Sequence, residues 1–263
     1  MSEDFAPIKD LAGARILVSN DDGIDAPGIK LLERIAKTLS DDVWVVAPAS
    51  EQSAVAHSLT VRRPLRMAKL SRRRYHVDGT PTDSVLLGVR QLLNDKRPAL
   101  VLSGVNRGAN LGEDVTYSGT VAAAMEGTLL GIPSIALSQQ CGGVGPVPWS
   151  TVEHWAPDLI RKLAATGWPR NVLMNVNFPD LPPDKVTGIA AAAQGKRKLG
   201  DELVERVDPR GQPYYWIGGQ RLEDPGLKGS DLEAIHAGKV VVTPLCVDFT
   251  HRTTLGKLAA LLR

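Results

Sequence analysis

Residues 14–39 read ARILVSNDDGIDAPGIKLLERIAKTL, and this stretch decides the fold of the chain. Its first six residues are a leucine-rich and β-branched run that predicts a strand, and the Gly/Pro-bounded turn that follows predicts a loop. The apolar residues of IKLLERIAKTL (29–39) recur at helical spacing, which predicts a helix. Strand, loop and helix in this order open a β-α unit. Two adjacent acids, Asp21 and Asp22, stand where the strand should simply end.

The same pattern recurs through the first half of the chain. VWVVAP (43–48) is a continuous apolar run stopped by proline, as expected for a buried parallel strand. Further strands are predicted at 99–104 and 133–137, and helices over 82–93 and 118–131. Residues 59–78 alternate more loosely and predict an antiparallel excursion. The expected fold class is therefore α/β, with a doubly wound, mostly parallel sheet.

The second half of the chain is less regular. Residues 150–165 predict a helix and 172–178 a strand. We expect three parts: an α/β core that carries the site over 1–178, an extension with hairpins for subunit contact over 179–230, and a strand and helix over 231–263 that return to the core or to a partner subunit. The extension, with strand-like pieces VTGIAAAA and YYWIGG, could alternatively form a semi-independent lobe.

Composition narrows the class of protein. With 263 residues and 43% hydrophobic content, the chain can bury a full core, which disfavours a disordered or fibrous protein. Lys and Arg number 31 against 29 Asp and Glu, so no overall charge bias indicates a nucleic-acid or membrane protein. The two cysteines lie far apart, the first ten residues do not resemble a signal peptide, and no run approaches the roughly 18 apolar residues of a membrane helix. We expect a soluble cytoplasmic protein.

Three polar clusters follow predicted strands: NDDG (20–23), SEQS (50–53) and SGVNRGAN (103–110). In an open parallel sheet, ligands bind outside the carboxyl ends of the strands. The clusters offer oxygen ligands without thiolate or imidazole, which favours a hard cation such as Mg²⁺ or Mn²⁺. An isolated Asn-Asp-Asp-Gly would be interpreted as an acidic turn before a helix. Since two adjacent carboxylates repel each other unless a cation or solvent separates them, a metal explains this pair better.

The helix that begins near Tyr117-Ser118-Gly119-Thr120 has a start suited to a phosphate group, because backbone N–H groups and hydroxyls stand together there. An ordinary Ser/Thr helix cap is the alternative. The chain has no GxxxxGK[ST] loop, and no GxGxxG follows the first strand. ATP-driven chemistry and nicotinamide binding are therefore disfavoured.

Several motifs, in order, resemble the SurE survival protein family of metal-dependent nucleotidases. They are SNDDG (19–23), DAPGI (25–29), VVAP (45–48), SEQSA (50–54), HSLT (57–60), DGTPTDSV (78–85), LVLSGVNRGANLGEDVTYSGTVAAAMEG (100–127), VVVTPL (240–245) and VDFT (247–250). The match covers essentially the whole chain and is densest over 15–138. The resemblance implies a Rossmann-like core, a C-terminal extension with β-hairpins that exchanges segments between subunits, and a homodimer or homotetramer.

The resemblance also implies an activity: a 5′/3′-nucleotidase that hydrolyses nucleoside 5′- and 3′-monophosphates, sometimes with exopolyphosphatase activity. The expected cofactor is one divalent ion per subunit, Mg²⁺ or Mn²⁺. The implied metal ligands are Asp21, Asp22, Ser53 and Asn106, and the implied phosphate-binding residues are Asn110, Ser118, Gly119 and Thr120. The loop 79–83 is expected to shape the site. Asp21 and Asp22 are the expected catalytic residues, with Asp21 as base, nucleophile or ligand only.

Two rival interpretations stay open at this point. Basic segments at 62–74 and 196–198 could bind nucleic acid or another polyanion, which would need no hydrolytic activity. They lack interleaved aromatic residues for stacking. A phosphatase of the kind that uses Asp-x-Asp after its first strand is the second rival, but here the two acids are adjacent.

Overall fold

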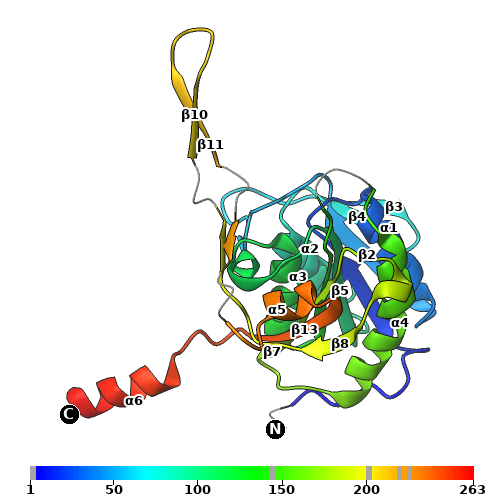
Figure 1. The fold of residues 1–263 in the computed structure, drawn as a ribbon. Coiled ribbons are helices and arrows are strands. Elements are labelled where there is room, and N and C mark those ends of the chain that lie inside the picture. The colour runs from blue at the N-terminus through cyan, green and yellow to red at the C-terminus, as the bar shows by residue number, and fades with distance from the viewer. Residues whose placement is uncertain (1–3, 143–145, 200–202, 218–220, 224–226) are drawn as a thin grey trace.

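A central sheet of nine strands lies between helices in the computed structural model, which describes residues 4–142, 146–199, 203–217, 221–223 and 227–263 (Figure 1). Its strands are β1 (Arg15–Ser19), β2 (Asp42–Pro48), β3 (Met67–Ser71), β4 (Arg74–Val77), β5 (Leu100–Arg107), β6 (Ser134–Gln139), β7 (Val172–Phe178), β8 (Gly188–Ala191) and β13 (Lys239–Cys246). They lie in the order β3-β4-β2-β1-β5-β6-β7-β13-β8. From β4 to β7 all neighbours are parallel, whereas β3 is antiparallel to β4 and β13 to β7.

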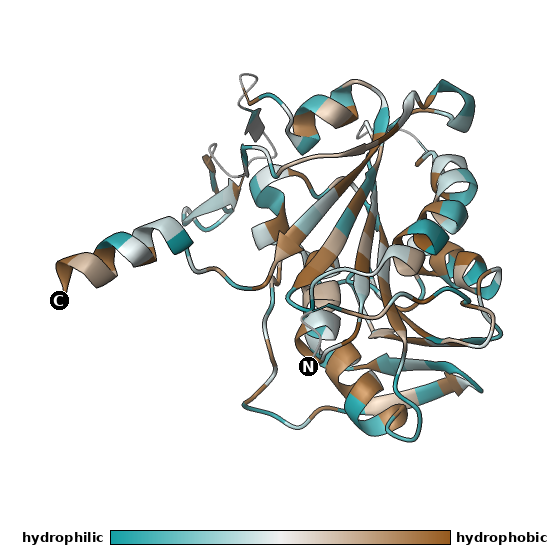
Figure 2. Ribbon diagram, turned by 90° about the horizontal axis from the view of Figure 1, so that it is seen from below, coloured by the Kyte–Doolittle hydropathy of each residue, from teal (hydrophilic) through white to brown (hydrophobic). Residues whose placement is uncertain are grey.

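The helices are α1 (Pro27–Lys37), α2 (Pro81–Leu87), α3 (Gly119–Leu129), α4 (Trp149–Thr166), α5 (Asp231–His236) and α6 (Arg252–Leu261), with short helical turns η1 (Gly88–Leu92), η2 (Gly112–Thr116) and η3 (Pro183–Lys185). Helices α1 and α4 pack together on one face of the sheet, and α2 and α3 on the other. Figure 2 shows hydrophobic residues along the central strands between these layers. The predicted doubly wound α/β fold is thus confirmed.

The opening stretch folds as its pattern predicts. β1 is buried along its whole length, with Ile16 and Val18 packed toward α1 and Leu17 toward α2. In α1, the apolar residues Ile29, Leu31, Leu32, Ile35 and Ala36 are buried. Pro27 lies in the first turn of α1, where no N–H is needed for the helix hydrogen bonds.

The chain reverses direction across the sheet next to β1. After α1 it enters β2 on one side of β1, and after α2 it enters β5 on the other side. A crevice forms at such a switch point, outside the carboxyl ends of the two strands. The polar loops after β1 and β5 therefore meet at one edge of the sheet.

The extension combines sheet strands with separate hairpins. β8 joins the main sheet beside β13, although it lies within the predicted extension 179–230. β9 (Arg197–Leu199) pairs with β12 (Arg221–Glu223), and β10 (Leu203–Val207) pairs with β11 (Pro213–Ile217) in a hairpin that projects from the body (Figure 1). In the predicted strand piece YYWIGG, residues 218–219 lie outside the described residues. The three-part division stays a prediction.

The C-terminal segment divides between the sheet and the periphery. β13 returns to the sheet, whereas α6 points away from the body in Figure 1 and has no buried residue. Across the described part of the chain, none of the helices has the length and apolar character required to cross a membrane.

Candidate active site

A cavity of about 480 Å³ opens at the carboxyl ends of β1 and β5. Its lining includes the predicted site residues Asp21, Asp22, Ser53, Asn106, Asn110 and Ser118, together with Glu51, Arg107, Asp114, Tyr117, Val147 and Trp149. The structure therefore brings six predicted residues, from β5 and from the loops beside it in the fold, to one cavity. The other two, Gly119 and Thr120, lie behind the lining, against Asp21.

Asp21 is held in a fixed position under the cavity floor. Its side chain is 5% exposed, and the Thr120 hydroxyl donates a hydrogen bond to its Oδ1. A methyl group added to Gly119 would lie 2.6 Å from the Asp21 Cβ, so only glycine allows α3 to start this close. Burial raises the pKa of Asp21 to about 6, against the hydrogen bond from Thr120, which lowers it. Thr120 thus contacts the carboxylate, and its side chain does not line the cavity.

Asp22 stands closer to solvent and completes the acidic pair. Its Oδ2 accepts a hydrogen bond of 3.4 Å from the backbone N–H of Arg107. Burial and the neighbouring charge of Glu51 raise the pKa of Asp22, while Arg107 lowers it. Negative charge is therefore concentrated in this part of the cavity, which favours a cation.

Ser53 and Asn106 supply neutral oxygens to the same cavity. The Ser53 hydroxyl is exposed and donates to Oε1 of Glu51 at 2.8 Å. The Asn106 amide nitrogen donates to the Gly108 carbonyl at 2.9 Å, so its side-chain oxygen is the atom available to a cation.

This donor set fits a hard divalent cation. Among the described residues, no three or more His, Cys, Asp or Glu side chains form a metal-binding group. A metal bound here would therefore need hydroxyl and amide oxygens beside the two carboxylates, which is the chemistry that Mg²⁺ and Mn²⁺ accept.

Asn110 and Ser118 form the side of the cavity near the start of α3, which packs against Asp21. A polar layer at the ends of β6 and β7 fixes Asn110: Ser138 accepts from its side-chain nitrogen at 2.8 Å, and Asn177 accepts from its backbone N–H at 2.8 Å. Ser118 caps α3, since its hydroxyl accepts from the Val121 N–H at 3.1 Å. The positive end of the helix dipole thus points at this side of the cavity.

Other residues that the sequence singled out have structural partners. The loop 79–83 is organised by Asp83, which accepts from the backbone N–H of both Thr60 and Thr80. Together with the N-cap Thr80, Asp83 forms the capping box of α2. None of the five residues of this loop lines the cavity. His57 contacts Oε2 of Glu126 at 3.0 Å and does not line the cavity either.

Some residues of the basic segments are paired with acids. Arg74 pairs with Glu33, and Arg73 pairs with Asp42 at 3.5 Å. In the second segment, Arg197 is buried. This pairing neutralises part of the charge on which polyanion binding would depend.

Several cavity residues escaped prediction from the sequence. Glu51 and Arg107 stand inside the polar clusters, so their place next to the predicted ligands could have been inferred. Tyr117 directly precedes the Ser118 cap. Trp149 begins α4 and has no local signal, because only the fold brings it to the cavity.

Comparison with known proteins shows the family of the chain. The family model described as Survival protein SurE matches residues 16–201. A protein named 5′-nucleotidase SurE from Paramagnetospirillum magneticum is 67% identical over 254 residues, covering 97% of this chain and 98% of that protein. One of the same name from Parvibaculum lavamentivorans is 58% identical over 247 residues, covering 93% and 89%.

A solved structure shares the fold. The crystal structure of the SurE protein from Aquifex aeolicus superposes with a TM-score of 0.83 at 42% identity, covering 95% of this chain and all of that one. The family model, these relatives and the shared fold show that the chain belongs to the SurE family.

Proposed function

We propose that this protein hydrolyses nucleoside 5′-monophosphates to nucleoside and phosphate, with a divalent metal ion as cofactor. The observation that carries the proposal is the acidic pair of buried Asp21 and half-buried Asp22, which shares a cavity with Asn110 and the Ser118 cap of α3. Acids next to anion-binding groups are what a metal and a phosphoryl group need. The relatives named 5′-nucleotidase SurE support the same activity.

Mg²⁺ or Mn²⁺ would be held by Asp21, Asp22, Ser53 and Asn106. When bound, such an ion supplies Lewis acidity toward a phosphoryl oxygen and lowers the pKa of water. Thr120 keeps the Asp21 carboxylate in one orientation through its hydrogen bond. Asp21 or Asp22 takes the proton of the attacking water and returns it to the sugar oxygen as the bond of that oxygen to phosphorus breaks.

Asn110 and Ser118 bind the phosphoryl oxygens. One hydrogen of the Asn110 side-chain amide is used by Ser138, which leaves the second for the substrate. The Ser118 hydroxyl accepts from Val121, so its own hydrogen remains to be donated. Donors fixed in this way stabilise charge that develops on the phosphoryl group.

The nucleoside lies toward the outer part of the cavity, where Tyr117, Val147 and Trp149 offer apolar and aromatic surface. Asn110, Ser118 and the residues that would hold the metal ion act only on the phosphoryl group. The proposal therefore includes nucleoside 3′-monophosphates and the ends of polyphosphate as further substrates.

We also propose a homo-oligomer, a dimer or a tetramer, in which the β10–β11 hairpin contacts another copy. Tyr215, Trp216 and Ile217 on this hairpin are 60%, 65% and 70% exposed, and aromatic surface of this kind is typical of protein contacts. Replacing Tyr215 and Trp216 with Ser should shift the molecular mass measured by light scattering toward the monomer. An unchanged mass would exclude this contact.

The activity is tested with a panel of nucleoside 5′- and 3′-monophosphates and polyphosphate, assayed for phosphate release with Mg²⁺, with Mn²⁺ and with chelator. Metal-dependent release from 5′-monophosphates is the expected result. Release that persists in chelator would contradict the metal dependence, and no release under any condition would contradict the enzymatic function.

A further inference from the structure

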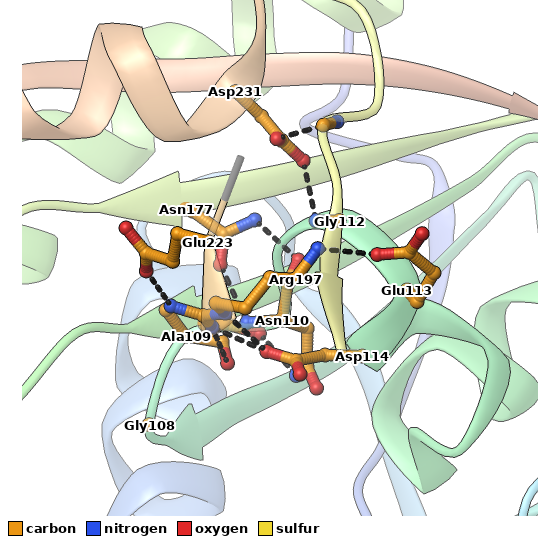
Figure 3. A network of polar contacts seen from close by, with 12 residues as sticks. Gly108, Ala109, Asn110, Gly112, Glu113, Asp114, Asn177, Arg197, Glu223 and Asp231 are labelled. Carbon is orange, nitrogen blue, oxygen red and sulfur yellow. Dashed lines mark hydrogen bonds and ion pairs between the residues drawn. The ribbon is translucent and has the colours of Figure 1, made fainter. Parts of the chain in front are cut away.

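A buried ion pair joins the extension to the loop that lines the cavity. Arg197 in β9 and Asp114 in η2 both have side chains that are 6% exposed, and two guanidinium nitrogens of Arg197 donate to Oδ2 of Asp114, one of them at 3.1 Å (Figure 3). Arg197 also donates to the Ala109 carbonyl at 3.4 Å. One arginine thus contacts both ends of the segment 109–114.

A second link runs beside the first. The carboxylate of Asp231, fully buried at the start of α5, accepts from the N–H of Gly112 at 2.9 Å and from the N–H of Gly195 at 2.8 Å. The backbones of Gly112 and Arg197 approach closely here, since a methyl group on Gly112 would lie 2.9 Å from the backbone nitrogen of Arg197. We call the contacts of Asp114, Arg197 and Asp231 the clamp.

The clamped segment connects the anion-binding groups of the cavity. Asn110 lies near its beginning, and the Asp114 carbonyl accepts from the Ser118 N–H at 3.1 Å. Any movement of Asp114 would therefore be passed to the cap of α3 as well as to Asn110. The residues that bind a cation come from other loops or from β5.

Buried ion pairs contribute little net stability, because desolvation offsets most of the attraction between the charges. Their geometric effect is larger, since two guanidinium nitrogens that donate to one carboxylate oxygen allow only a narrow range of carboxylate positions. Arg197 is also one of the basic residues for which the proposed hydrolysis has no direct use.

We propose that Arg197 is a positioning residue for phosphate binding: from the extension it holds the segment 109–118 so that Asn110 and Ser118 address the phosphoryl group together. The inference rests on the proposed function. It predicts that losing the clamp weakens binding of substrate and inorganic phosphate, while cation binding is spared.

The test compares Arg197→Met with Arg15→Met in the full-length, metal-loaded protein. Arg15 is the matched control, because it is a buried arginine paired with Asp42 at 2.9 Å at the opposite end of the sheet. For Arg197→Met we expect KM and the inhibition constant of inorganic phosphate to rise together by about 10- to 100-fold, as for other residues that orient a ligand-binding group. The Mg²⁺ or Mn²⁺ affinity, measured by calorimetry without substrate, should change by less than about twofold. Arg15→Met should leave KM and phosphate inhibition unchanged.

Arg197→Lys and the pair Asp114→Asn with Arg197→Met extend the test. Lysine keeps the charge without the two fixed donors of the guanidinium, so it should restore part of the phosphate affinity. The double variant should bind phosphate no more weakly than Arg197→Met alone, because both changes remove the same contact. Should Arg197→Met fail to fold, the lysine variant carries the comparison.

Two results would overturn the positioning role. One is hydrolysis by Arg197→Met with the KM and phosphate inhibition of the unchanged protein. The other is an equal loss of cation affinity, which would indicate a general disturbance of the fold. Absence of phosphate release by the unchanged protein would instead reject the proposed function, and phosphate binding by calorimetry would still test the clamp.

Discussion

The two ends of the central sheet differ in whether their acidic side chains form ion pairs. At the amino end, Arg15 is paired with Asp42 and Asp95, both at 2.9 Å, and the Trp44 indole donates to Asp42 at 2.8 Å. At the carboxyl end, neither Asp21 nor Asp22 forms an ion pair within the described residues, although Asp21 is the more deeply buried of the acids compared here.

The pKa values of Asp42 and Asp21 are shifted in opposite directions as a result. Burial raises the pKa of Asp42, but hydrogen bonds from Arg15 and Trp44 outweigh it and bring that pKa below 3.8. At Asp21, burial dominates and the pKa rises to about 6. A charge that the fold itself neutralises serves stability, whereas a charge left without a partner is available to a ligand.

The largest expected effect comes from removing one of these free charges. Asp21→Asn should lower kcat/KM by about 10³-fold or more, equivalent to at least about 4 kcal/mol of transition-state stabilisation. The variant should fold normally, because it removes an uncompensated buried charge. Asp42→Asn at the amino end is the control and should keep its activity while losing stability. Comparable activity in the two variants, measured by phosphate release, would contradict the distinction between the two ends.

The second prediction uses pH on the metal-free protein. Because the folded pKa of Asp21 lies above its unfolded value of 3.8, the folded state binds the proton more tightly between pH 3.8 and about 6. Stability should therefore fall as pH rises through this window, by up to about 3 kcal/mol. Asp42 should act in the opposite sense, stabilising above pH 3.8 and losing this contribution as pH falls through its lowered pKa.

Urea unfolding in chelator, measured at several pH values between 3 and 8, checks both signs. Asp21→Asn should flatten the fall in stability between pH 4 and about 6, and Asp42→Asn should remove a stabilising contribution at neutral pH. If Asp21→Asn leaves the pH profile unchanged, the buried carboxylate is not the source of the dependence.

The third prediction concerns two glycines. Gly119→Ala should push Asp21 and the start of α3 apart, since the new methyl would lie 2.6 Å from the Asp21 Cβ. A displacement of this size in a catalytic site can lower kcat/KM by about 10²-fold. Gly13, near the amino end of β1, has no atom within 4 Å of such a methyl, so Gly13→Ala should be active. Equal kcat/KM values for the two variants would mean that close packing at Gly119 is not required.

The smallest expected effect comes from a residue outside the cavity. Thr80 caps α2, and its hydroxyl accepts from the Asp83 N–H at 3.1 Å, outside the cavity. Thr80→Ala should therefore reduce the free energy of unfolding by about 1 kcal/mol. Its kcat/KM should equal that of the unchanged protein. A loss of activity larger than the loss of stability explains would assign the loop 79–83 a direct part in the site.

Local patterns predicted most of the fold and the location of the site. The strand, turn and helix over 14–39 depend on neighbours in the chain, and the polar clusters follow their strands directly, so both are visible in the sequence. Contacts between distant segments are not. Thr120 and Asp21 are 99 positions apart, and no pattern indicates that the Thr120 hydroxyl would reach the carboxylate. The clamp could not be predicted for the same reason, since in the sequence Arg197 is only one residue of the basic segment 196–198.

The position of β13 has a consequence for how the chain folds during synthesis. β13 lies between β7 and β8, so β8 is joined to the main sheet only through a strand that begins at Lys239. Before Lys239 and the rest of β13 have been synthesised, the edge of β7 that pairs with β13 is open, and β8 has no neighbouring strand in the main sheet. Such an open strand can pair with another chain. The main sheet is therefore completed only after residues 239–246 have been synthesised.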